Sequence, residues 1–173
     1  MKTIIGIVLL AVMTGTVGFA LDNASHPVTM RVNEVCRIGL DSSSGISLEV
    51  GGQAAGGLPP VGAVDSSKAL RYTSVVPAGA SRRITANWGP ADKPPSGTSL
   101  ILNVIDMPAG SGLPAGQITL SGDPQNIITG IRSCSTGNDA VRLQYTFRVE
   151  DVNGLVQGDS TTVNISFTLT DAS

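Results

Sequence analysis

The chain has 173 residues, of which 11 are basic and 13 acidic, so its formal net charge is −2 at neutral pH. Such sparse, slightly acidic charge excludes the basic surface through which proteins bind nucleic acid or anionic membranes. Aromatic residues make up only 3% of the chain and glycine is frequent, with 21 copies, which favours short strands and turns over helices.

Residues 1–20 have the features of a cleavable signal peptide. Lys2 provides a positive charge, residues 4–13 form an apolar run, and small residues lead up to Ala20. The apolar run is well short of the roughly 20 residues that cross a bilayer, so a retained anchor is disfavoured, and a lipid attachment lacks a nearby cysteine. We therefore predict cleavage after Ala20 and a secreted or cell-surface protein that no longer contacts the membrane.

The chain contains two cysteines, Cys36 and Cys134. In an exported protein an even pair is most simply a disulfide, and we predict one here. Two free structural thiols are the alternative. A metal site is disfavoured, because two isolated cysteines and one distant histidine do not form a tetrahedral ligand set.

Alternation of apolar and polar residues predicts β-strands along most of the chain. The predicted strands lie within residues 28–40, 46–50, 70–76, 84–88, 100–104, 118–120, 127–131, 141–149 and 163–169. Glycine- and proline-rich segments separate them, and Asn153-Gly154 is a turn-forming pair between the last two. This pattern predicts an all-β antiparallel sandwich over residues 36–173, preceded by a leader or donor strand at residues 21–35.

Residues typical of a catalytic or metal site are scarce. The only histidine, His26, lies next to Pro27 near the start of the mature chain, where a solvated side chain is the simplest interpretation. Most aspartates lie in turns, where they usually bond their own backbone. Four residues could offer oxygens to calcium, although their spacing is not that of the twelve-residue calcium loop: Glu150, Asp151, Asn153 and Asp159. We predict a protein that is not an enzyme and that has no cofactor or metal.

Two further features suggest binding or modification. Trp88 is the single indole and could serve as a stacking platform for a sugar, but it shares its phase with Ile84, so a core position is favoured. The triplets that begin at Asn23 and Asn164 match the N-glycosylation sequon, which is short and common by chance.

The leader carries its own alternating pattern. Val28, Met30 and Val32 form an apolar stripe ahead of Cys36. An exposed segment of this kind can add to the sheet of a neighbouring molecule, with backbone bonds supplying affinity and alternate side chains supplying specificity. The alternative is that residues 28–40 are one continuous strand of the chain's own sandwich.

Four features of the chain are the signal peptide, the apolar stripe ahead of Cys36, the Ser/Thr/Gly/Val-rich body and the closing strand at residues 162–170. In these features the chain resembles bacterial secreted subunits of the fimbrial, or pilin, kind. The resemblance implies an immunoglobulin-like fold whose N-terminal strand completes the sheet of the next subunit. Val28, Met30 and Val32 would then be the inserted residues.

These observations lead us to predict an extracellular structural subunit of a filament, such as a pilus or fimbria, or of another surface assembly. Its partner would be a further copy of itself, joined head to tail by strand addition. The alternative is a monomeric secreted binding module for carbohydrate or another ligand. A secreted hydrolase is a third, less favoured possibility.

Overall fold

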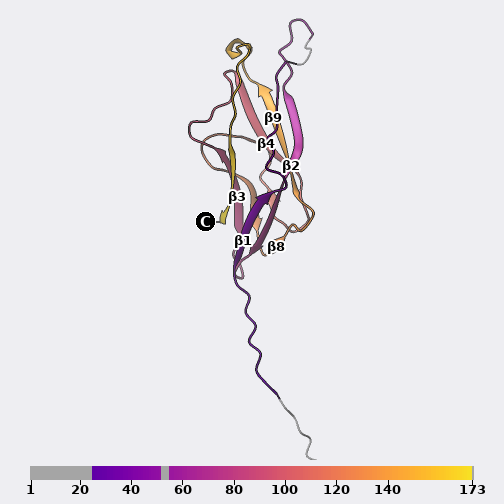
Figure 1. Cartoon of the computed structure of the whole chain (residues 1–173), viewed down its shortest axis with the longest axis vertical. Coiled ribbons are helices and arrows are strands. Elements are labelled where there is room, and N and C mark those ends of the chain that lie inside the picture. The colour runs from indigo at the N-terminus through magenta and orange to yellow at the C-terminus, as the bar shows by residue number, and fades with distance from the viewer. Residues whose placement is uncertain (1–24, 52–54, 173) are drawn as a thin grey trace, which may run out of the picture. The chain divides into compact units, whose positions relative to one another are not determined.

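The computed structural model describes residues 25–51 and 55–172 (Figure 1). The predicted signal peptide and Asn23 therefore lie outside the described residues. The chain divides into two units, residues 1–31 and residues 32–173. In the first unit, residues 25–31 belong to no strand or helix, and every side chain is exposed.

In the described part of the second unit there are ten strands and one short 3-10 helix, η1 (Val152–Gly154). The strands are β1 (Val35–Leu40), β2 (Ala63–Val75), β3 (Arg82–Trp88), β4 (Thr98–Asp106), β5 (Leu113–Pro114), β6 (Ile118–Thr119), β7 (Gln125–Ile131), β8 (Cys134–Ser135), β9 (Val141–Val149) and β10 (Ile165–Asp171). All of their pairings are antiparallel.

The strands form two sheets that pack face to face. One sheet has the order β1-β2-β9-β4-β6, with β8 alongside β2, and the other has the order β10-β3-β7-β5 (Figure 1). Apolar side chains from both sheets fill the space between them, among them Leu70, Ile84, Leu102, Ile128 and Leu143. The predicted all-β antiparallel sandwich is therefore confirmed.

Strand β9 illustrates why alternation predicts this fold well. Val141, Leu143 and Tyr145 are buried and face the core, whereas the intervening Arg142 is exposed. Strand β2 pairs with one side of β9 and strand β4 pairs with the other, so the backbone groups of β9 are bonded along its length. The strand has the bounds that its sequence predicts, residues 141–149.

The connection between β9 and β10 crosses from one sheet to the other. Asp151 caps η1 at its start by accepting a 2.9 Å bond from the N–H of Asn153. Gly154 then lies so close to Gly97 that a Cβ at Gly154 would meet the Gly97 Cα at 2.9 Å. The predicted Asn153-Gly154 turn is present, and its glycine permits this close approach of two loops.

Three predicted strands differ from the observed ones. Residues 46–50 form no strand, although Ile46 and Leu48 pack against the core. Strand β2 begins at Ala63, well before residue 70. The sequence did not predict its first half because a register shift between Asp65 and Lys68 interrupts the two-residue period there. The first strand is Val35–Leu40, so the alternative of one continuous strand over residues 28–40 is wrong for residues 28–34.

Candidate functional site

The last strand, β10, is paired on one side only. Among the described residues its single strand partner is β3. The N–H of Ala172 donates to the carbonyl of Ser81, so even-numbered residues of this segment bond towards β3. Because bonding direction alternates along an antiparallel strand, the N–H and C=O groups of Ile165, Phe167 and Leu169 point away from β3. We call these backbone groups the open edge of β10.

The side chains of the same three residues face the core, yet two of them are incompletely covered. Ile165 and Phe167 are only half-buried although they pack against the core cluster, and only Leu169 is buried. An unpaired strand edge flanked by half-covered apolar side chains is a template for another extended segment. The open edge of β10 therefore offers both backbone bonds and apolar contacts.

Strand β1 lies next to β10 and has an unpaired side of its own. The N–H of Asp41 donates to the carbonyl of Ala69 at 3.0 Å, so odd-numbered residues of β1 bond towards β2. The backbone groups of Cys36, Ile38 and Leu40 consequently point away from β2. Since β1 and β10 are in contact, the two unpaired edges meet on one flank of the sandwich.

A buried arginine joins β1 and β10 at one end of this flank. The guanidinium of Arg82, only 3% exposed, bonds the carboxylates of Glu34 and Asp171, the latter at 3.0 Å. It also donates to the carbonyl of Val35 and to the hydroxyl of Ser74. We call Arg82, Glu34 and Asp171 the Arg82 clamp. It fixes the start of β1 and the end of β10 to the same point.

The predicted interface residues of the leader are exposed. The exposed fractions are 67% for Val28, 90% for Met30 and 86% for Val32. These residues form no strand, whereas β1 starts only three positions after Val32, at Val35. All three side chains of the apolar stripe are thus exposed and belong to no strand.

The predicted disulfide between Cys36 and Cys134 is absent, and both residues are free thiols. Each is paired in register with Ser74, Cys36 from one side of β2 and Cys134 from the other. Two strand spacings place their Cα atoms about 9–10 Å apart, whereas a disulfide needs a Cα separation below about 7 Å. Burial raises the pKa of the Cys134 thiol.

Thiol Sγ of Cys36 donates to the carbonyl of Leu169 at 3.6 Å. That carbonyl belongs to the open edge of β10, so the contact confirms the direction in which this edge points. The Cys36 side chain itself is exposed.

Trp88 does not form a stacking platform. It is 8% exposed and packs in the core with Ile84 and Ala86, which is the core position that the sequence favoured over a stacking platform. Asn164, the second glycosylation candidate, is exposed immediately before β10, and its N–H donates to Asp92 at 3.0 Å.

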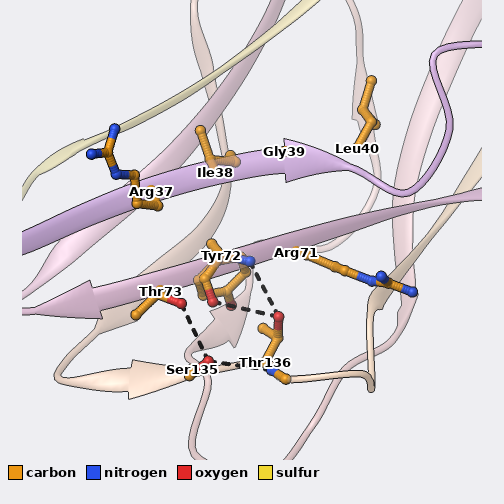
Figure 2. A pocket seen from close by; sticks show the side chains of 10 residues that line it. Arg37, Ile38, Gly39, Leu40, Arg71, Tyr72, Thr73, Ser135 and Thr136 are labelled. Carbon is orange, nitrogen blue, oxygen red and sulfur yellow. Dashed lines mark hydrogen bonds between the residues drawn. The ribbon is translucent and has the colours of Figure 1, made fainter.

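An open depression of about 210 Å³ lies over β1, β2 and β8 (Figure 2). Its two guanidinium groups, from Arg37 and Arg71, point in opposite directions. The hydroxyls of Thr73 and Ser135 bond each other at 3.2 Å. Because the charged groups diverge and these hydroxyls are already paired, the depression does not assemble a converging ligand set.

The acidic residues considered for calcium have other partners. Oε1 of Glu150 accepts bonds from Ser99 at 2.5 Å and from Arg148 at 2.8 Å, and these contacts lower the pKa of that carboxyl. Asp151 caps η1. Within residues 25–51 and 55–172, no group of three or more His, Cys, Asp or Glu side chains is placed to hold a metal ion. Across the same residues no helix is long and apolar enough to cross a membrane.

The sequence did contain a signal for the Arg82 clamp that the prediction did not use. Alternation in residues 82–88 puts Arg82 in phase with the core residues Ile84 and Ala86, so its side chain had to point inwards. A buried arginine needs anionic or carbonyl partners, and two of the groups it found lie in the segments that begin β1 and end β10.

Comparison of the chain with family models, curated proteins and solved structures finds no match.

Proposed function

We propose that this protein is a secreted structural subunit that polymerises by β-strand addition, with the leader of one copy bound along the open edge of β10 of the next. The observation that carries the proposal is the coexistence of an exposed alternating stripe and an unpaired, partly covered strand in the same chain. Each feature alone is an aggregation hazard, and together they are complementary.

The side-chain spacing supports this match. Along the leader, apolar residues recur at every second position, and along β10 the core-facing residues Ile165, Phe167 and Leu169 do the same. Within the described residues no strand pairs with the outward backbone groups of those three residues, although the Cys36 thiol contacts the carbonyl of Leu169. A leader that bonds to them places its own apolar side chains on the same face, over the half-buried Ile165 and Phe167.

The contact is heterologous, because the leader of one copy meets a different surface of its neighbour. Repetition of a heterologous contact that does not close into a ring generates a filament. We therefore favour a filament of the pilus or fimbrial type. A surface assembly built on the same contact remains within the proposal.

The test removes the apolar stripe while keeping the leader. Wild-type protein is compared with the triple variant Val28→Ser, Met30→Ser, Val32→Ser, and the products are examined by negative-stain microscopy and size-exclusion chromatography. We expect fibres from the wild type and monomers from the variant, because the apolar area that would be buried at the interface is lost.

A matched control alters the other face of the leader, with Thr29→Ser, Arg31→Gln and Asn33→Ser. We expect this control to polymerise like the wild type. Fibres that persist in the apolar triple variant would contradict strand addition, and a monomeric wild type would contradict the structural role altogether.

A further inference from the structure

The Arg82 clamp has two exposed carboxylates at the end of the open edge. One guanidinium faces two carboxylates, and both carboxylates remain accessible: the Glu34 side chain is 58% exposed and that of Asp171 is 79% exposed. Cys36, the next core-phase residue of β1, contributes no countercharge. The clamp thus keeps a net negative charge where β1 begins and β10 ends.

The same clamp determines the direction in which a neighbour's leader can run. Glu34 is held at the clamp, so the leader of every copy leaves its domain at that end. In a head-to-tail row of equally oriented copies, the leader reaches the neighbour from the end where β10 begins and continues towards the neighbour's clamp. Its later residues then lie near Ile165 and its earlier residues near Asp171. The leader is consequently antiparallel to β10.

The spacing of the two segments then defines a register. Placing the three residues of the apolar stripe opposite the three residues of the open edge pairs Val32 with Ile165, Met30 with Phe167 and Val28 with Leu169. The next pair in the same phase is His26 with Asp171. His26 is the only histidine of the chain, and it is exposed within the leader.

We propose that the Arg82 clamp sets the register of assembly by receiving His26 of a second copy beside Asp171. The inference rests on the proposed function and adds the residue that fixes the alignment. The imidazole can donate to the exposed carboxylate of Asp171, and its charged form matches the net negative charge of the clamp. A shift by two residues would keep the apolar stripe on the same face, but it would place His26 opposite Leu169 or beyond Asp171, where no carboxylate lies opposite it.

The register can be measured with paired cysteines on the outer face of the two strands. In the proposed alignment Thr29 lies directly opposite Thr168, in a pair that is not hydrogen-bonded, where Cα atoms are about 4.5 Å apart and a disulfide can form. The variant Thr29→Cys, Thr168→Cys is made in a Cys36→Ser, Cys134→Ser background that has first been shown to form fibres. The matched control is Thr29→Cys, Ser166→Cys, which is shifted by two residues.

After mild oxidation, we expect the first variant to give a ladder of covalent oligomers on non-reducing gels and the control to give monomers. A ladder from the control, or fibres that yield no ladder from either variant, would overturn the register while leaving strand addition intact. Crosslinking within a single copy would overturn it as well. Absence of fibres from the wild type would instead contradict the proposed function.

The role of His26 is tested separately by charge. His26→Asp places a carboxylate opposite Asp171, whereas Ser25→Asp adds the same charge at a position that faces the other way. We expect fibres of His26→Asp to dissociate in denaturant roughly two- to fivefold faster than fibres of Ser25→Asp, and Asp171→Asn to reduce that difference. Equal dissociation rates for the two aspartate variants would overturn the His26 contact.

Discussion

Strands β9 and β10 have nearly the same alternating sequence pattern and very different surroundings. In β9 the core-facing Leu143 is fully buried, and strands pair with both of its sides. In β10 the core-facing Phe167 is half-buried, and only β3 pairs with it. Alternation reports which face of a strand is apolar, but the number of neighbours decides how much of that face is covered.

This difference divides the sandwich into a completed centre and an incomplete flank. Substitutions in the centre should affect the folded subunit most strongly, because no other molecule can compensate there. Substitutions on the flank should affect the subunit less and the assembly more.

The largest effect on the isolated subunit is expected for Leu143→Ala. The substitution leaves a cavity at a fully buried site between the sheets, so the free energy of unfolding should fall by about 2–5 kcal/mol. Urea denaturation of the monomeric stripe variant measures it without interference from fibres. If Leu143→Ala lowered the free energy of unfolding by less than Phe167→Ala does, the division into centre and flank would be contradicted.

A smaller loss is expected for Arg82→Met, which removes the Arg82 clamp and keeps most of the side-chain volume. The hydroxyl of the buried Ser74 and the carbonyl of Val35 lose a donor, so the free energy of unfolding should fall by about 1–3 kcal/mol.

The matched control is Glu34→Gln, which alters only an exposed partner of the same arginine. It should change the free energy of unfolding by about 0–1 kcal/mol. An equally large effect of Glu34→Gln would show that the exposed ion pair, rather than the buried hydrogen bonds, stabilises the clamp.

Phe167→Ala should cost the isolated subunit only about 1–2 kcal/mol, less than the value of about 3–5 kcal/mol typical of a fully buried phenylalanine. Fibres should lose more than monomers, because strand addition would cover this side chain. Denaturation curves of the monomeric stripe variant and of assembled material, each with and without the substitution, measure both losses. Equal losses in the two states would argue that β10 is not the acceptor.

A separate effect concerns alkaline pH. Burial raises the pKa of Tyr72 to about 12, although a side-chain hydrogen bond with Ser111 acts in the opposite direction. The unfolded phenol ionises near pH 10, so stability is complete below about pH 10 and decreases as the pH rises towards about 12, since only the unfolded state releases the proton.

Denaturant midpoints at about pH 9 and about pH 11 measure this decrease, and Tyr72→Phe should reduce it. Burial also raises the pKa of Tyr145, so part of the decrease should remain in the variant. A decrease that Tyr72→Phe leaves unchanged would assign the effect to other groups.

The fold could be predicted from the sequence because the sandwich needs an alternating apolar face, and most strands display one. Residues 46–50 also display an alternating apolar face, yet they form no strand. The prediction was wrong there because alternation does not reveal whether a hydrogen-bonding partner is within reach. The first half of β2 was missed for the opposite reason. There Asp65 accepts bonds from the N–H and hydroxyl of Ser67, and the local irregularity hides the two-residue period.

The site was predictable in part. The apolar stripe of the leader is a local pattern, and the structure leaves it exposed. The open edge of β10 could not be predicted, because strand order depends on contacts between distant segments. The prediction of a disulfide failed for the same reason. The number of cysteines does not show how the strands pair, and in the structure Ser74 of β2 lies between Cys36 and Cys134.

The Arg82 clamp has a consequence for the timing of folding. It connects Glu34, which precedes β1, to Asp171 in β10, so it can form only after the chain has been synthesised as far as β10. Until then β10 is missing and β3 lacks a partner on that side. Until β10 has been made, a nascent chain therefore carries more unpaired edges than the folded domain.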